Sequence, residues 1–124
     1  MNLLNYGSLK ASKRLVDAGI VLETDFYWIL YPTEAGYLLG DKSSVLLSIK
    51  HYPAPSMAEA WRELPRTFNE ANPELWKVSY ITYCAYCDGN LQLMEHSISN
   101  TNPTDALIDL LIWARKEAKL SVNF

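Results

Sequence analysis

Apolar and polar side chains alternate most regularly from Trp76 to Tyr86, and this pattern predicts a β-strand. Both faces of the expected strand are partly apolar, so it should lie within a sheet or between two layers. Asp88-Gly89-Asn90 is typical of a hairpin turn, and the return strand is expected from Leu91 to Ile98. The proline- and asparagine-rich stretch before this unit, Pro65 to Pro73, is expected to be a loop.

The segment Asp25–Tyr31 is dense in aromatic and β-branched residues, which favours another strand. A turn follows it, and Gly36–Gly40 is the expected return strand of a second hairpin. Val45–Tyr52 carries a weaker strand pattern. We expect that strand to end at Pro53, because proline has no backbone N–H to donate to a neighbouring strand.

Two short helices are predicted from their capping residues. Ser8 can cap a helix that stops at Gly19, since glycine readily adopts the left-handed conformation that ends many helices. Ser56 and Glu59 form a capping box, in which each side chain accepts from the backbone N–H of the other residue. The second helix should carry its apolar residues on one face, namely Met57, Ala60, Trp61 and Leu64.

The longest helix is predicted at the C-terminal end of the chain. Asn102 caps it, Pro103 occupies its first position and Asp105 places a negative charge in its first turn. Its apolar residues cover more of the circumference than one packed face needs: Leu107, Ile108, Leu110, Leu111, Ile112, Trp113, Ala114 and Ala118. Two interpretations stay open, because such a helix is either enclosed by its own domain or shares one face with a partner.

Together these elements predict an α+β fold in a single domain that covers residues 1–124. A small antiparallel sheet, made of two hairpins or of one mixed set of strands, should be packed by three helices, including the long C-terminal one. A chain of 124 residues can build its own core without a metal or disulfide bonds. We therefore expect no cofactor.

Cys84 and Cys87 form a CxxC pair, which elsewhere holds zinc or acts as a redox dithiol. A zinc site needs two further ligands, and a redox pair belongs at a helix N-terminus. Here both residues lie in the expected strand, where positions three apart point to opposite faces and stand about 10 Å apart. We therefore expect two structural cysteines without a disulfide, unless the strand ends at Tyr83.

Other candidates for chemistry are few. His51 and His96 are the only histidines, and neither is joined to a carboxylate by a recognisable motif. The chain contains no nucleophile elbow, phosphate-binding loop, dinucleotide-binding glycine motif or zinc-protease motif. We therefore expect no enzymatic activity, no catalytic residue and no metal site.

The charge balance bears on partners and location. With a net charge of −3, the chain lacks the basic excess that neutralises a nucleic-acid backbone, so we expect no nucleic-acid partner. No apolar run reaches the roughly 18–20 residues that span a bilayer, and the N-terminal segment does not have the pattern of a secretion signal. We therefore expect a cytoplasmic protein that does not interact with a membrane.

A partner surface is the remaining hypothesis for function. Tyrosine and tryptophan are enriched at protein interfaces, and large apolar side chains on the last helix exceed what one sheet face can cover. Core packing explains many of the same residues equally well. The candidate interface residues are Ile108, Ile112, Trp113, Tyr31, Tyr37 and Tyr52.

Two stretches read together resemble a known group of proteins. One is Ser12–Ile20 with the aromatic strand after it, and the other is Tyr52–Pro65 with the hairpin and the Asp105–Trp113 ending. In this order they resemble small uncharacterised proteins of phages and integrated mobile elements in gut bacteria of the Bacteroides type. The resemblance covers most of the chain and involves caps, turns and core positions. It implies a bacterial, cytoplasmic setting and an accessory role for a mobile element.

The sequence thus predicts a non-enzymatic accessory protein that acts through protein–protein interaction, with another protein or with a second copy of itself. The alternative is a protein that binds and sequesters a small metabolite or nucleotide. Its pocket would lie between the sheet and the Pro53–Leu64 helix. A pocket with converging polar groups favours this alternative, and an exposed apolar patch favours the interaction protein.

Overall fold

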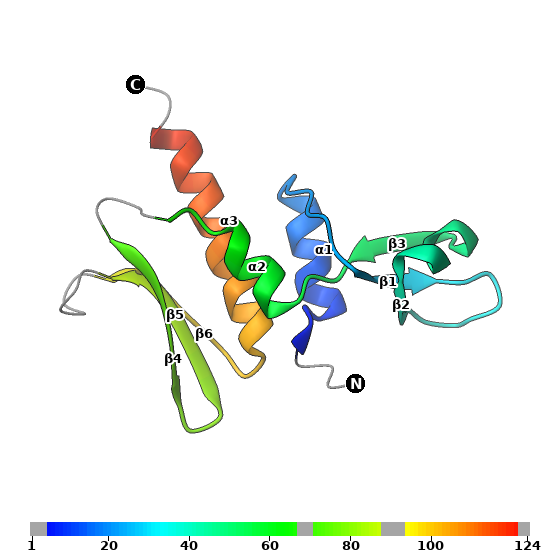
Figure 1. Cartoon of the computed structure of the whole chain (residues 1–124), viewed down its shortest axis with the longest axis horizontal. Helices are drawn as coiled ribbons and strands as arrows, with labels where there is room; N and C mark the ends of the chain where they lie inside the picture. Colours follow the sequence, from blue (N-terminus) through cyan, green and yellow to red (C-terminus); the bar gives the residue numbers. More distant parts are fainter. Residues whose placement is uncertain (1–4, 67–70, 88–93, 122–124) are drawn as a thin grey trace.

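The computed structural model describes residues 5–66, 71–87 and 94–121, with side chains in the last range from 97 to 117. It confirms the α+β class, because the described residues form two small antiparallel sheets of three strands each together with helices. The sheets do not merge into one. They lie on opposite sides of the helices, which form the middle of the molecule (Figure 1).

The first sheet has β1 (Phe26–Leu30) in its centre, flanked by β2 (Leu38–Asp41) and β3 (Lys50–Pro53). The expected hairpin of β1 and β2 is present, with the two strands paired antiparallel. The expectation of one strand over Val45–Tyr52 is wrong in its first half, since η2 (Lys42–Leu47) is a 3₁₀ helix.

A cap explains why η2 forms where a strand was expected. The Asp41 carboxylate accepts from the backbone N–H of Ser44 at 3.2 Å and from the Ser43 hydroxyl at 2.6 Å. These bonds lower the pKa of Asp41, the Ser43 hydroxyl contributing most, because they favour the ionised carboxylate. Local side-chain bonds of this kind compete with extended backbone and tighten the chain into a turn.

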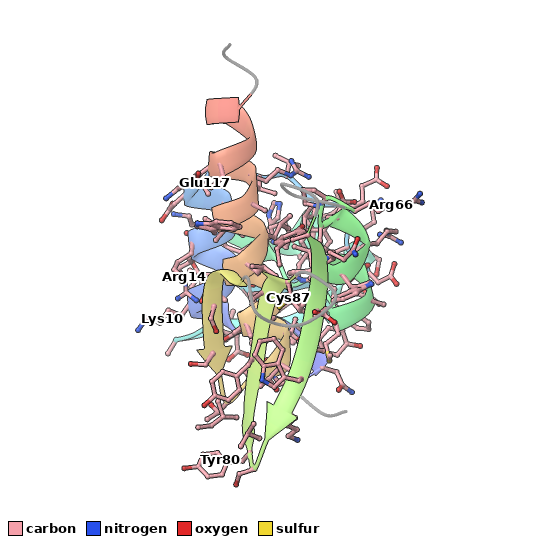
Figure 2. All side chains as sticks on the ribbon, turned by 90° about the vertical axis from the view of Figure 1, so that its left-hand side faces the viewer. Lys10, Arg14, Arg66, Tyr80, Cys87 and Glu117 are labelled. Carbon is pink, nitrogen blue, oxygen red and sulfur yellow. The ribbon has the colours of Figure 1, made fainter. Side chains whose placement is uncertain are left out.

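The second sheet contains β4 (Asn72–Val78), β5 (Ile81–Cys87) and β6 (Met94–Asn100), in that order. The single strand expected over Trp76–Tyr86 is wrong, because the chain reverses at Ser79 and Tyr80. Ser79 has a φ of 57°, the left-handed conformation of a tight turn, which glycine and asparagine adopt more readily than serine. Figure 2 shows Tyr80 at the outer end of this hairpin.

Pro73 lies within β4, so the loop expected up to this residue is wrong at its C-terminal end. Proline fits there because β4 is an edge strand, which has no neighbour on one side to accept an N–H. β5 and β6 pair antiparallel from Cys87 and Met94 outward, as expected for a hairpin. The predicted turn at residues 88–90 lies outside the described residues.

The helices begin where their caps predicted. α1 (Leu9–Asp17) has Ser8 as its N-cap, and Gly19 follows with a φ of 77°. α2 (Met57–Glu63) has the complete capping box. The Asn102 side chain accepts from the backbone of Thr104 and of Asp105 at the start of α3 (Pro103–Ser121).

α3 lies at the centre of the core and packs against α1, α2 and the second sheet. It contributes more side chains than any other element to a buried cluster that also includes Leu15 of α1, Ala60 of α2 and Tyr86 of β5. Two polar contacts also join α1 to α3. Ser8 donates to the Asp105 carboxylate from its backbone N–H at 2.7 Å and from its hydroxyl at 2.6 Å, and Arg14 pairs with Asp109 through two bonds of 3.0 and 3.1 Å.

Candidate interaction surfaces

An apolar groove runs between α2 and β4. It has a volume of about 360 Å³, and its lining residues are Met57, Ala58 and Trp61 of α2, Leu75 of β4 and Leu107 of α3. Leu107 is buried, whereas Trp61 is 42% exposed and Leu75 is 37% exposed. We call this feature the α2–β4 groove.

Two local features place these side chains. The capping box fixes the start of α2, so Met57 and Trp61 stand one helical turn apart on the side that faces β4. Leu75 pairs with Cys84, whose thiol donates to the backbone carbonyl of Ala106 in α3. Because directly paired residues share a face of a sheet, Leu75 points to the helices.

The groove continues along β4 as a second hollow of about 330 Å³. This part is lined by Met57, Leu75, Trp76, Lys77, Thr82 and Pro103. Among the described residues that line it, Lys77, Thr82 and the indole N–H of Trp76 supply the polar side-chain groups. Specific recognition of a polar ligand needs several converging polar groups, so the lining suits an apolar side chain better than a phosphate or a sugar.

The groove has no arrangement typical of catalysis. Within the described part of the chain, no group of three or more His, Cys, Asp and Glu side chains could hold a metal ion. None of the residues that line the groove is a cysteine, a histidine or a carboxylate. The groove therefore lacks the imidazole, thiol and carboxylate groups that most often act as general acids, bases and nucleophiles.

A second apolar surface lies at the end of the first sheet. Leu46 is 90% exposed, Leu47 71% and Ile49 65%. The backbone N–H of Ile49 donates to the carbonyl of Leu30 at 2.7 Å, which ties this segment to β1. We call Leu46, Leu47 and Ile49 the η2 tip, and Figure 1 shows η2 on the side of the first sheet that is farthest from the second sheet.

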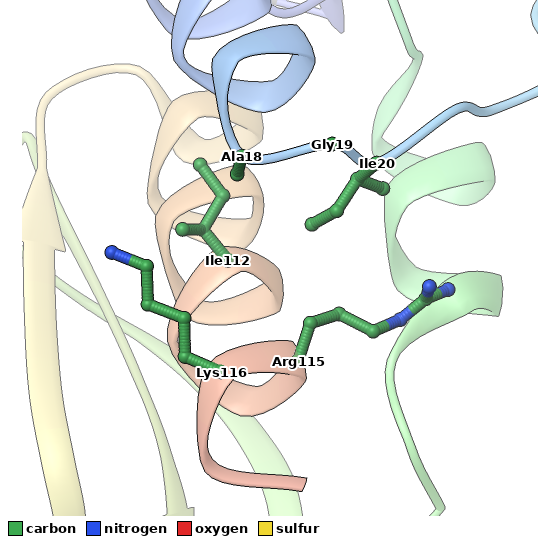
Figure 3. A pocket seen from close by; sticks show the side chains of 6 residues that line it. All are labelled: Ala18, Gly19, Ile20, Ile112, Arg115 and Lys116. Carbon is green, nitrogen blue, oxygen red and sulfur yellow. The ribbon is translucent and has the colours of Figure 1, made fainter. Parts of the chain in front are cut away.

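The candidate residues on α3 have three different surroundings. Ile108 is fully buried, so it belongs to the core and does not form a surface in this fold. Trp113 packs against Tyr86 with ring centroids 6.3 Å apart. Ile112 is partly buried and lines a hollow of about 80 Å³ between α1 and α3, beside Ala18 (Figure 3).

The candidate tyrosines lie around the first sheet, away from those α3 residues. Tyr37 and Tyr52 have ring centroids 5.8 Å apart, and the ammonium group of Lys13 lies over both rings. A Cβ added to Gly40 would lie 3.3 Å from the Tyr31 hydroxyl. Tyr31, Tyr37 and Tyr52 are each half-buried. The six candidates therefore do not form one continuous surface.

Both cysteines are buried, and neither forms a disulfide. Burial raises the pKa of the Cys84 thiol to about 12, with a smaller contribution from Asp109, so the thiolate is strongly disfavoured. His51 is exposed, with Nδ1 3.2 Å from the Ser48 hydroxyl and its ring edge-on to Tyr27. The side chain of His96 lies outside the described residues.

Sequence analysis missed the residues of both surfaces as candidates. It placed Trp61 on the apolar face of a helix, assigned Leu46 to a strand, and left Leu75 between the expected loop and the next strand. The sequence does contain one sign of the η2 tip. Leu46-Leu47 next to Ile49 is a run of large apolar side chains that follows neither a helix nor a strand period.

Within the described residues, no helix is long and apolar enough to cross a membrane. Comparison of the chain with protein-family models, curated proteins and solved structures finds no match. The surfaces themselves are therefore the basis for any functional conclusion.

Proposed function

We propose that the protein is a non-enzymatic interaction module whose α2–β4 groove receives apolar side chains of a protein partner. The observation that carries this proposal is the exposure of Trp61 and Leu75 on either side of the groove, above the buried Leu107. Tryptophan and methionine are enriched in interface cores, where a few well-packed side chains supply most of the affinity.

The wider setting belongs to the same proposal. The resemblance of the sequence to small phage and mobile-element proteins supports an accessory role in a bacterial cytoplasm. An interaction module fits that role, because an accessory protein can act by occupying a surface of another protein without any chemistry of its own.

Binding of a small molecule is the second candidate. The groove lies between α2 and the second sheet, where the sequence placed such a pocket, and its volume falls in the range of ligand sites. Its mainly apolar lining favours an apolar ligand over a nucleotide, because few of the described lining residues could meet a polar group. Its open form leaves one side of a small ligand in water, which favours a side chain anchored in a protein.

Selection from a peptide display library tests the interaction proposal. The wild-type protein is the target, and the Leu75→Asp variant removes peptides that bind elsewhere. We expect enriched peptides with two or more apolar anchors, and affinity at least tenfold weaker for Leu75→Asp. Val78→Asp is the matched control, because Val78 lies on the same strand, is 57% exposed and does not line the groove.

Circular dichroism of each variant checks that the fold is retained. The interaction proposal is wrong if no enriched peptide depends on Leu75. A rise in melting temperature with nucleotides or apolar metabolites, absent in Leu75→Asp, would support the small-molecule candidate instead.

A further inference from the structure

We propose that the partner of the α2–β4 groove is a second copy of this chain, whose η2 tip enters the groove in a head-to-tail contact. This inference rests on the proposed function of the groove. It starts from the presence of two apolar surfaces on one molecule, one of them a hollow and the other a set of exposed side chains. The tip presents Leu46, Leu47 and Ile49 to solvent, and the groove presents Trp61 and Leu75.

The two surfaces belong to different sides of the same molecule. The η2 tip is held by the first sheet, and the groove lies against the second sheet, on the other side of the helices (Figure 1). A tip therefore cannot enter the groove of its own chain without unfolding. Only another molecule can supply it.

The sizes of the two surfaces match. A cavity of roughly 150 Å³ accommodates one benzene-sized apolar group, so a groove of about 360 Å³ has room for two leucine side chains. Leu46 and Leu47 are adjacent and almost fully exposed. The groove offers them few polar groups, so their entry would leave little polar surface without hydrogen bonds.

The area sets the strength of the contact. Complete burial of one exposed leucine removes on the order of 100 Å² of apolar surface from water. The three tip residues, together with the exposed parts of Trp61 and Leu75, then give roughly 500 Å², well below the 1,200–2,000 Å² of a stable complex. A single contact should therefore be weak, and association should depend strongly on concentration.

The geometry of the contact also determines how association proceeds. A tip-to-groove contact uses different surfaces on the two copies, so each copy keeps one free tip or one free groove. Copies therefore add at both ends until a ring closes or a chain grows. An interface that pairs identical patches would instead stop at a dimer.

Two single-surface variants test this arrangement in the full chain. Leu46→Asp removes the tip, and Val21→Asp is its control, because Val21 is also 90% exposed and lines neither surface. Trp61→Glu removes the groove, and Arg62→Glu is its control on the same helix. Circular dichroism checks the fold, and Leu47→Asp and Leu75→Asp serve as second variants if either protein is unfolded.

Sedimentation velocity and light scattering over a hundredfold range of concentration give the readout. We expect the average mass of the wild type and of both controls to rise with concentration, and each single-surface variant to remain monomeric. An equimolar mixture of Leu46→Asp and Trp61→Glu should form a dimer and stop there. In that mixture the intact tip of Trp61→Glu binds the intact groove of Leu46→Asp. The two surfaces left free are the mutated tip and the mutated groove, so no further copy can add.

Three results would overturn the proposal: a wild type that stays monomeric throughout, a single-surface variant that still associates, or a mixture that does not dimerise. The proposed function is tested separately with the peptides selected above. Leu46→Asp keeps its groove, so these peptides should bind it as they bind the wild type. Peptide binding without self-association would reject the second copy as partner and retain the groove as an interaction site.

Discussion

Gly7 lies where the N-terminal segment crosses the core, and replacing it with alanine tests how tightly that crossing is packed. A Cβ added at Gly7 would lie 2.5 Å from Cδ1 of Ile108 and 3.5 Å from Pro55. The backbone around it cannot move freely. The Gly7 N–H donates to the Pro55 carbonyl, and the Gly7 carbonyl accepts from Trp28 Nε1, both at 2.8 Å.

The magnitude follows from these contacts. One extra methyl group in a packed core costs about 1–3 kcal/mol. Alanine also reduces the conformational freedom of the unfolded chain, which stabilises the folded protein by about 0.4–1 kcal/mol. This gain applies here because φ at Gly7 is not in the left-handed region, so alanine can adopt it. We expect Gly7→Ala to lower the free energy of unfolding by about 1–2 kcal/mol. With a slope of about 1–3 kcal/mol per M in urea, the midpoint should fall by about 1 M.

Ile108→Val removes the Cδ1 atom that the new methyl group would meet. Alone it should cost about 0.5–1.5 kcal/mol. In the double variant the alanine methyl occupies space that Cδ1 has left, so the two costs should not add. We expect a favourable coupling of about 1 kcal/mol or more between the two sites.

Urea denaturation of the wild type, both single variants and the double variant measures this cycle. Gly36→Ala is the control, because a Cβ at Gly36 has no atom within 4 Å, and its stability should stay the same or rise slightly. If Gly7→Ala leaves the free energy of unfolding unchanged, the inference of close packing at this position is wrong. Additive effects in the double variant would refute the contact between Gly7 and Ile108.

Three further predictions concern buried polar groups. Ser12→Ala should raise the free energy of unfolding by about 1 kcal/mol, because the buried Ser12 hydroxyl has no hydrogen-bond partner among the described residues. A loss of stability in urea denaturation would contradict this. Cys84 and Cys87 should resist alkylation in the native protein and react after unfolding, as mass spectrometry can measure, whereas rapid native labelling would show that they are accessible. Burial raises the pKa of Asp109 although the neighbouring Arg14 lowers it, so protonation of Asp109 favours the folded state. As the pH falls from neutral to about 4, the wild type should therefore gain stability relative to Asp109→Asn, which cannot titrate at this position. A relative loss of stability would refute the raised pKa.

Capping residues are the part of the fold that the sequence predicted best. Ser8, Gly19, Ser56 and Asn102 act within three or four residues of their own position, so their effect does not depend on distant contacts. The same locality explains the hairpin of β1 and β2.

The strands of the second sheet were harder to predict because alternation does not show where a chain reverses. Ser79 and Tyr80 include no glycine or asparagine of the kind that marks a two-residue hairpin turn, and the turn exists because β4 gains its pairing with β5 along its whole length. Pro73 is tolerated because β4 became an edge strand. Both facts depend on the position of the strand in the sheet.

The candidate surfaces depended on tertiary packing in the same way. The sequence identified α3 as too apolar for one sheet face. The structure explains this, because α1, α2 and the second sheet all pack against it and Ile108 is enclosed. The exposed apolar residues of the two candidate surfaces lie elsewhere, on α2, on β4 and at the η2 tip.

The sequence alone thus determined the class of fold, the starts of the helices and the absence of recognisable catalytic motifs, because these follow from periodicity, local hydrogen bonds and residue chemistry. Only the tertiary structure decided that the strands form two separate sheets and that Trp61 and Leu75 remain partly exposed beside a groove. Periodicity shows that a side chain belongs to an apolar face, but its burial depends on which distant segment packs there.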